Sequence, residues 1–388
     1  MSERCKSMEK IVSKVFCTGC GCCCNICPKG AISMISDNNG FKYPVIDHEK
    51  CINCGLCKKR CPIFLGKNKT LNECYAAYNT DDDVLMSSSS GGIFYQLASL
   101  VLEDNGIVIG AAFDNNQKLV HTIATNKNDM LKLMGSKYLQ SDLKKIYKII
   151  KETLTNKKVL FVGTPCQVAG LKSYIGSENP NLICVDLICH GVPSIKLFEK
   201  YVEELQISNS DVLNKYNFRD KSTGWDNYSV SIKFSNSSKK ELSTNNSYMK
   251  LYLSNLALRE SCYNCNFKLG NKYSDITLGD YWGIQNFHKD MYNKKGVSAV
   301  IINTKKGAEV FDKIKNNIIY RKTSLNDIVS GNLCLKKSCD IPLKREIFFE
   351  DMKNYSCNEL CKKYCKIPLY KKIIMKLKST IKTIIHKN

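Results

Sequence analysis

The sequence contains no apolar run that approaches the length of a membrane-spanning helix. Residues 1–10 are polar and charged, with no apolar run behind them, which does not fit a secretory signal peptide. We therefore expect a cytoplasmic protein. Cysteines stay reduced in that compartment, so the 22 cysteines of the chain predict metal binding rather than disulfides.

Acidic residues are also scarce. The chain has 36 Asp and Glu against 58 Lys and Arg, which gives a formal net charge of +22. The lysines are scattered instead of gathering in a patch that carries aromatic residues, so we expect no nucleic-acid binding. An acidic electron-carrier partner or an anionic membrane surface accounts for the charge at least as well.

Two cysteine runs with the same spacing, C-x2-C-x2-C-x3-C-P, lie near the start of the chain. They consist of Cys17, Cys20, Cys23 and Cys27, and of Cys51, Cys54, Cys57 and Cys61. In this bacterial ferredoxin pattern, three cysteines wrap one 4Fe-4S cluster and the fourth reaches the other cluster. The spacing predicts one cluster held by Cys17, Cys20, Cys23 and Cys61. It predicts a second cluster held by Cys51, Cys54, Cys57 and Cys27.

The alternative for these runs is a pair of zinc sites. Zinc needs only two C-x2-C pairs and gives no reason for two complete runs that each end in Cys-Pro. Cys22 and Cys24 are surplus to the pattern, and we expect them to be packed or bystander thiols. Between the runs, residues 31–47 have the pattern of a short hairpin that covers the clusters.

Beyond residue 70 the sequence alternates between predicted strands and helices. Buried-type strands are expected at 106–113, 158–162, 182–188 and 298–303. Helical patterns lie at 92–103, 142–154 and 167–174. Residues 212–235 have the pattern of antiparallel strands inserted into this domain. We expect an α+β ferredoxin module, residues 1–70, followed by an α/β domain with a mixed sheet, residues 71–340.

A run of small polar residues precedes the first of these helices. Four serines followed by two glycines occupy residues 87–92. Free backbone amides at a helix N-terminus suit a phosphate or pyrophosphate group. A plain serine N-cap with a flexible lead-in explains the same residues, so both interpretations stay open.

Further cysteines follow predicted strands in the larger domain. Thr164 is placed to cap a helix whose first residue is proline, and Cys166 then lies in the first turn. The helix dipole stabilises a thiolate there, as a cluster ligand or redox cysteine requires, although a buried structural cysteine fits too. With Cys189 and the pair Cys262 and Cys265 it would complete a third set of four thiols. The alternatives are zinc at that pair alone, or no metal.

An ordered set of motifs extends over residues 73–335. It comprises Ser89-Ser90-Gly91-Gly92, Gly135-Ser136-Lys137-Tyr138, Gly163 to Gln167, Cys189 to Pro193, Phe218 to Lys221 with Gly224-Trp225, and Asp275 to Gly283. This set resembles the family of coenzyme F420 hydrogenase/dehydrogenase beta subunits, which also includes plant 7-hydroxymethyl chlorophyll a reductase. The resemblance implies an FAD-containing iron–sulfur oxidoreductase with a cluster beside the flavin.

The resemblance also implies roles for individual residues. It favours the third cluster at Cys166, Cys189, Cys262 and Cys265. It places FAD near Ser89, Ser90, Gly91, Gly92, Lys137 and Thr164, although an ordinary surface lysine is the alternative at position 137. His190 would donate a proton to reduced substrate, or would simply stabilise its turn.

We expect residues 341–388 to form a basic helical tail. Cys357, Cys361 and Cys365 recur every four residues, and we predict that they are packing residues because no fourth ligand accompanies them. From Leu369 onward, an apolar stripe is surrounded by lysines. Such a helix would lie on an anionic membrane or, as the favoured alternative, dock against the protein or a partner.

Two functions fit these features. The leading one is an FAD-dependent iron–sulfur oxidoreductase that passes electrons between a two-electron substrate and the clusters or a ferredoxin partner. The substrate would be a deazaflavin such as coenzyme F420, or another organic compound. The rival is a non-catalytic multi-cluster carrier subunit of a larger redox complex.

Overall fold

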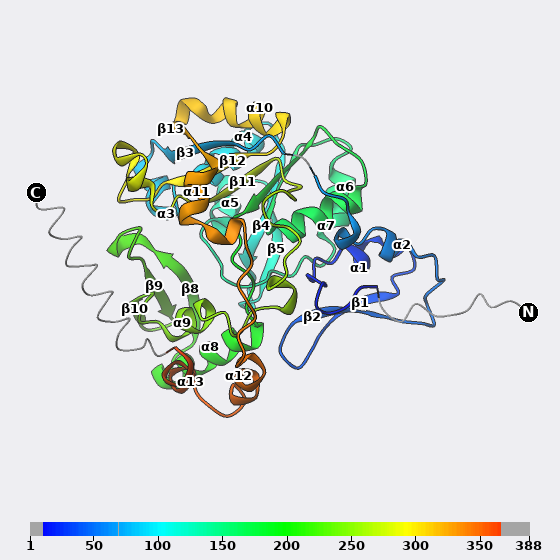
Figure 1. Cartoon of the computed structure of the whole chain (residues 1–388), viewed down its shortest axis with the longest axis vertical. Coiled ribbons are helices and arrows are strands. Elements are labelled where there is room, and N and C mark those ends of the chain that lie inside the picture. The colour runs from blue at the N-terminus through cyan, green and yellow to red at the C-terminus, as the bar shows by residue number, and fades with distance from the viewer. Residues whose placement is uncertain (1–10, 69, 366–388) are drawn as a thin grey trace, which may run out of the picture.

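The computed structural model describes residues 11–68 and 70–365. Figure 1 shows a small module at one side of the molecule, with α1 and α2 next to α7 of a larger body built around a sheet. The amphipathic stripe predicted from Leu369 onward lies outside the described residues.

The small module repeats one local structure. Its elements are α1 (Cys22–Ile26), β1 (Ile32–Ser36), β2 (Lys42–Ile46), α2 (Leu56–Lys59) and a 3-10 turn, η1 (Pro62–Phe64). Each helix follows a left-handed glycine, Gly21 or Gly55, and both have φ 70°. That conformation favours glycine because it has no Cβ. β1 and β2 pair antiparallel, which confirms the predicted hairpin.

The body contains an eight-stranded sheet in the order β13-β3-β12-β11-β7-β6-β4-β5. Its strands are β3 (Glu73–Asn79), β4 (Ile107–Phe113), β5 (Leu119–Ala124), β6 (Val159–Gly163), β7 (Leu182–Leu187), β11 (Ile276–Asp280), β12 (Ser298–Ile302) and β13 (Ile318–Thr323). β4, β6, β7 and β11 pair parallel, whereas β5, β12 and β13 each pair antiparallel with a neighbour. The predicted mixed sheet is confirmed.

Helices cover both faces of this sheet. One face packs against α4 (Ile93–Glu103), α5 (Lys127–Leu133) and α10 (Lys305–Ile314). The other face packs against α6 (Ile146–Thr153) and α7 (Pro165–Ile175). β4 shows why: Val108 belongs to the first core, and its neighbours Ile107 and Ile109 belong to the second. Successive strand residues point to opposite faces, so a strand buried on both faces has one continuous apolar run.

One predicted boundary was wrong. The helix expected from residue 142 begins at Ile146, because Asp142 is part of the sheet edge instead. Asp142 forms a parallel bridge with Val120, and its carboxylate accepts a hydrogen bond from the Lys144 amide at 2.9 Å. Lys144 itself has φ 44°, outside the helical region.

A second layer lies below the sheet in Figure 1. It consists of α8 (Ile195–Asn209), α9 (Ser247–Leu253), α12 (Arg345–Asp351), α13 (Cys357–Tyr364) and the strands β8 (Leu213–Asp220), β9 (Ser229–Phe234) and β10 (Ser238–Leu242). The strands form a separate antiparallel sheet, as predicted for 212–235. In α13, Cys357 is buried, and the Cys361 thiol donates to the Ser247 oxygen at 3.3 Å.

The remaining helices are α3 (Asp82–Ser87) and α11 (Leu325–Gly331). β3 pairs antiparallel with β12, which is itself antiparallel to β11, so β3 runs with the parallel strands. The carboxyl ends of β3, β6, β7 and β11 therefore share one edge of the sheet. The motifs that begin near residues 87, 163, 188 and 280 all leave the sheet there, where open α/β sheets usually bind ligands.

Candidate functional site

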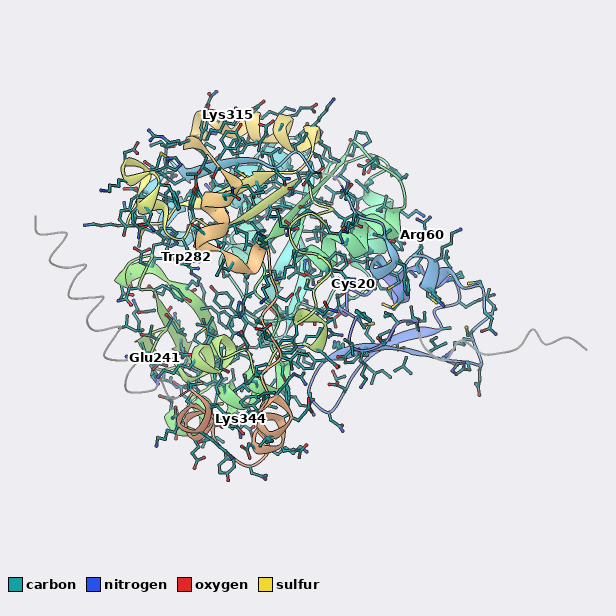
Figure 2. All side chains as sticks on the ribbon, in the orientation of Figure 1. Cys20, Arg60, Glu241, Trp282, Lys315 and Lys344 are labelled. Carbon is teal, nitrogen blue, oxygen red and sulfur yellow. The ribbon has the colours of Figure 1, made fainter. Side chains whose placement is uncertain are left out.

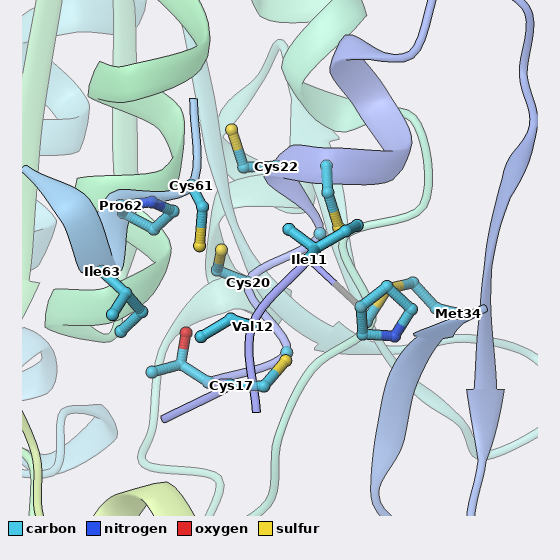
Figure 3. Close-up of a pocket in the computed structure, with 14 residues that line it drawn as sticks. Ile11, Val12, Cys17, Cys20, Cys22, Met34, Cys61, Pro62 and Ile63 are labelled. Atoms are coloured by element: carbon cyan, nitrogen blue, oxygen red, sulfur yellow. The ribbon is translucent and has the colours of Figure 1, made fainter. Parts of the chain in front are cut away.

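The first cysteine-lined cavity lies within the small module. The thiols of Cys17, Cys20, Cys23 and Cys61 line about 350 Å³ of space, together with Cys22, Ile11 and Val12. Figure 3 shows Cys17, Cys20 and Cys61 around this space, with Val12 beside them. Three cysteines of the first run thus meet the last cysteine of the second run, which is the arrangement that the spacing predicts.

The second cavity has the reciprocal composition. Cys51, Cys54 and Cys57 of the second run line it with Cys27 of the first, around about 370 Å³. The Ala31 amide donates to the Cys27 sulfur at 3.3 Å. Hydrogen bonds to cluster sulfurs are one of the means by which a protein sets a cluster's reduction potential.

A third cavity of about 520 Å³ opens at the carboxyl edge of the large sheet. It is lined by Cys166 at the start of α7, by Cys189 and His190 after β7, and by Cys262 and Cys265. The structure therefore gathers the third set of thiols from three distant segments. Cys334 also lines this cavity, and no spacing signal pointed to it.

The thiols of the third cavity lie close enough to affect one another's ionisation. Burial is the main cause that raises the pKa of Cys262 to about 12, and negative charge on Cys265 and Cys166 contributes to the same rise. Burial also raises the pKa of Cys189, and Cys262 is its strongest charged neighbour. Four thiolates in one buried space would repel one another unless a cation lay between them. A coordinating metal supplies that positive charge and deprotonates the thiols. The donor set fits a metal cluster.

The first and third cavities adjoin each other. Thr18 lines both of them. Behind Thr18, α7 carries Cys166 in its first turn and packs Gly170 against Cys20: a Cβ built on Gly170 would lie 3.1 Å from the Cys20 sulfur. The sequence missed Thr18 and Gly170, because neither belongs to a ligand pattern.

Two lysines that the sequence did not single out also line the third cavity. The Lys268 ammonium donates to the backbone oxygens of Cys189 at 3.1 Å and of Cys334 at 2.7 Å. The buried Lys272 ammonium lies 3.0 Å from one oxygen of the Asp186 carboxylate. The other oxygen of that carboxylate has no hydrogen-bond partner among the described residues. Asp186 neutralises Lys272, so the positive charge at the cavity comes from Lys268, which favours a negatively charged occupant.

The serine and glycine run leads into α4 at the same edge of the sheet. The Ser89 hydroxyl accepts a hydrogen bond from the Ser136 amide at 2.6 Å, and the Ser90 hydroxyl donates to the Val297 oxygen at 2.8 Å. Gly92 is the N-cap of α4, with φ 76° and no side-chain capping bond. The serine hydroxyls thus bind protein groups, whereas the amides of the first turn of α4 have no side-chain cap. Those amides fit a phosphate.

Two lysines hold the loops around this run. The Lys137 ammonium donates to the Lys132, Leu133 and Met134 carbonyl oxygens at the end of α5, between 2.7 and 3.2 Å. The buried Lys221 ammonium donates to the Ser90 oxygen at 3.0 Å and to the Leu85 and Lys295 oxygens. In this structure both ammonium groups position backbone segments. Lys221, which belongs to the motif at 218–221, fixes the serine and glycine run directly.

Arg219 connects the remaining motifs. Its buried guanidinium pairs with the Asp280 carboxylate at 2.6 Å, and the Trp225 indole N–H donates to the same carboxylate at 2.7 Å. The Trp225 ring stacks on Trp282 with centroids 4.9 Å apart. The guanidinium also lies 4.3 Å from the centre of the Tyr228 ring. Motifs that are far apart in the sequence thus form one network.

His190 lies beside the third cavity. Its Nε2 is 2.6 Å from the Asn255 side-chain oxygen, and its ring meets Tyr252 edge-on at 5.5 Å. Burial lowers the pKa of His190. Thr164 caps α7 as predicted: the Gln167 side-chain oxygen accepts from the Thr164 amide at 3.0 Å, and the Thr164 hydroxyl lies 3.2 Å from the Cys166 sulfur.

Among residues 11–68 and 70–365, no group of three or more Cys, His, Asp or Glu converges closely enough to hold a single metal ion. Within the same residues, no helix is long and apolar enough to cross a membrane.

Comparison with known families decides the relationship. Residues 74–148 and 156–327 match the N-terminal and C-terminal parts of the coenzyme F420 hydrogenase/dehydrogenase beta subunit, and residues 16–64 match the 4Fe-4S dicluster domain. The chain belongs to the family of coenzyme F420 hydrogenase/dehydrogenase beta subunits. It carries an additional ferredoxin domain and is an iron–sulfur electron-transfer protein of this family.

Relatives in this family include redox proteins that use coenzyme F420. The chain is 29% identical over 173 residues to the coenzyme F420-dependent sulfite reductase of Methanocaldococcus jannaschii, covering 42% of this chain and 26% of that protein. It is 22% identical over 237 residues to a component of the F(420)H(2) dehydrogenase of Methanosarcina mazei, covering 54% of this chain and 64% of that one. A chain of the F420-reducing [NiFe] hydrogenase complex from Methanosarcina barkeri aligns with a TM-score of 0.45 and 19% identity, covering 77% of this chain and 93% of that chain.

Proposed function

We propose that the protein is an FAD-dependent iron–sulfur oxidoreductase with three 4Fe-4S clusters in a row. The observation that supports it most strongly is the shared wall of the first and third cavities at Thr18. One set of four thiols lies in the body and two sets lie in the ferredoxin domain. The adjoining first and third cavities bring the set in the body next to a set in the ferredoxin domain. The substrate that we propose is a two-electron organic compound, with coenzyme F420 a candidate because relatives use it.

Bound FAD would exchange an electron pair with the substrate and single electrons with a cluster, and each cluster would carry one electron at a time. The chain would supply the binding sites for these groups. Cys166, Cys189, Cys262 and Cys265 would hold the third cluster, and the amides at the start of α4 would bind a phosphate of FAD.

The surrounding residues would set the charge and geometry of the site. Lys268 places an ammonium group at the third cavity, where it favours the reduced, more negative state of an occupant, whereas Lys272 is paired with Asp186. Lys221 holds the Ser90 backbone, and the Arg219–Asp280 pair holds the loops after β8 and β11. His190 would hold or release a proton at its free ring nitrogen beside the same cavity.

Iron and flavin content per chain, after strictly anaerobic purification with added FAD, tests the proposal. We expect about twelve irons and about one FAD per chain. About eight irons and no flavin would overturn the catalytic proposal and leave the ferredoxin clusters. The rival function, a carrier subunit without catalysis, would then stand.

A further inference from the structure

The cavities of the ferredoxin domain differ in their access to solvent. In the first cavity, Cys17, Cys20 and Cys61 are 7%, 8% and 8% exposed, and Gly170 of α7 packs against Cys20 from the body side. In the second cavity, Cys54 is exposed. An outside protein can therefore approach a thiol of the second cavity more closely than those of the first.

The rim of the second cavity carries more positive than negative charge. Lys29, Lys58 and Lys59 are exposed, and none of them forms an ion pair with another described residue. Of the nearby acids, the carboxylate of Asp47 lies 2.7 Å from the Lys50 ammonium and is already neutralised. Glu49 is exposed and outside the ion pairs of the described residues, so three lysines face one acid here. The three free lysines are thus available to a partner.

The orientation of α2 places two of these lysines, Lys58 and Lys59, on the outside. Arg60, the residue after α2, turns toward the body: its guanidinium donates to the Ser173 oxygen at 3.3 Å, and its carbonyl accepts from the Ser173 hydroxyl at 2.8 Å. Figure 2 shows Arg60 and Cys20 on the side of the module that meets the body. Lys58 and Lys59 remain exposed, and so does the apolar side chain of Ile52, which is 57% exposed.

We propose that this rim, Lys29, Ile52, Cys54, Lys58 and Lys59, is the docking surface for a small acidic protein that carries one electron. Ile52 offers an apolar contact, and cationic residues surround it. Protein interfaces commonly have such an apolar centre and polar rim. Complementary charge would steer the carrier to this face and fix its orientation. The inference rests on one part of the proposed function, that the clusters transfer electrons between the body and this surface.

The transfer at this surface is a single-electron step. One electron leaves the reduced cluster of the second cavity and enters the oxidised centre of the carrier, with no bond made or broken and no proton moved. Cys54, the exposed ligand, would be the point of closest approach.

The test uses the full chain with its clusters, reduced with dithionite and desalted, and mixed in a stopped-flow instrument with an oxidised small acidic ferredoxin. We expect K29E/K58E/K59E to lower the second-order rate constant about tenfold or more. The matched control K305E/K313E/K322E reverses three lysines on α10 and β13, which are also exposed and also outside the ion pairs of the described residues. It makes the same change in net charge and should keep the rate constant within about twofold.

Two further measurements keep the outcome decisive. Cluster content, from the integrated electron paramagnetic resonance (EPR) signal of each variant, separates lost docking from lost clusters. If the triple variant loses clusters, the wild-type rate constant decides: it should fall with rising salt for the acidic ferredoxin and not for a basic c-type cytochrome. Equal slowing by both triple variants, or faster reduction of the cytochrome, would overturn the proposal. Because dithionite reduces the clusters directly, a failure here is distinct from a missing flavin.

Discussion

The Arg259 guanidinium donates to the backbone oxygen of Cys17 at 2.8 Å. Arg259 is fully buried in the body, three residues before Cys262, whereas Cys17 begins the first ferredoxin run. The guanidinium also donates to the Lys42 oxygen at 2.6 Å and to the Gln140 side chain at 3.1 Å. One side chain of the body thus binds the cluster loop and the hairpin of the ferredoxin domain.

Arg259→Met should loosen the ferredoxin domain from the body. The substitution leaves the Cys17 and Lys42 carbonyl oxygens without a donor, and each lost hydrogen bond to a charged group costs about 1.5–3 kcal/mol. We expect unfolding at lower urea concentration and slower reduction of the ferredoxin clusters from the body side. Urea titration followed by the cluster absorbance measures the first effect.

Arg321→Met is the matched control for that change. Arg321 pairs with Asp290 at 2.6 Å, but both side chains are about half exposed, and surface pairs contribute about 0–1 kcal/mol. Its urea midpoint should stay near that of the wild type. Equal losses in both variants would show that Arg259 does not join the two parts.

Gly170→Ala should disturb the first cluster from within α7. The added methyl group would lie 2.9 Å from the Tyr147 hydroxyl and 3.1 Å from the Cys20 sulfur. Overpacking of this kind costs about 1–3 kcal/mol, and here it also displaces Cys20, which we propose as a cluster ligand. We expect a changed EPR signal from one ferredoxin cluster and faster loss of iron in air. Gly66→Ala, where no atom lies within 4 Å of the added methyl, should behave as the wild type.

Removal of two thiols should empty the third cavity alone. The double variant C262A/C265A should retain about eight of about twelve irons, because the ferredoxin thiols belong to other segments. Cys334→Ala should retain about twelve, since four thiols remain at the cavity. Cys184→Ala is the control for a buried thiol outside all three cavities. Loss of about four irons in C334A instead would make Cys334 a ligand.

Acid should weaken the fold through His121. Its Nε2 lies 3.0 Å from the Val162 oxygen and its Nδ1 2.8 Å from the Ser141 hydroxyl. Burial lowers the pKa of His121 from 6.5 to about 4. Between those values the unfolded chain binds a proton that the folded chain does not, so stability falls as the pH falls through this range.

His121→Gln measures that contribution, because glutamine does not titrate. Between pH 7.5 and 5.5 the wild type should lose about 1 kcal/mol more unfolding free energy than this variant. His48→Gln, at an exposed position, should lose as much as the wild type. The same loss in all three proteins would show that His121 does not account for the acid sensitivity.

The repeated pattern of the ferredoxin runs predicted most of the local structure. Fixed spacing and a following proline leave few arrangements open, and the cavities contain the cysteines that the spacing pairs. The strand pattern likewise located β4, β6, β7 and β12, which are mostly buried and apolar. It missed the edge strands β5 and β13, and also β3, which contains two alanines, and β11, where Gly279 interrupts the apolar pattern.

Contacts between distant segments were beyond the reach of the sequence. Arg259 looks like one cation among many, and only the fold shows that it contacts Cys17 and Lys42. Lys137 could be placed near a loop, but its binding to carbonyl oxygens at the end of α5 depends on backbone geometry. Such contacts carry no local periodicity, which is the signal that pattern reasoning uses.

Photoreduction of the bound flavin tests the central claim most directly, that electrons pass from the flavin through the third cavity to the ferredoxin domain. FAD-loaded protein is illuminated anaerobically with a sacrificial donor and frozen for EPR at intervals. The wild type should show three reduced clusters. C262A/C265A should bleach its flavin while both ferredoxin clusters stay oxidised. Equally fast reduction of those clusters in the variant would contradict the account, because electrons would then reach them without the third cluster.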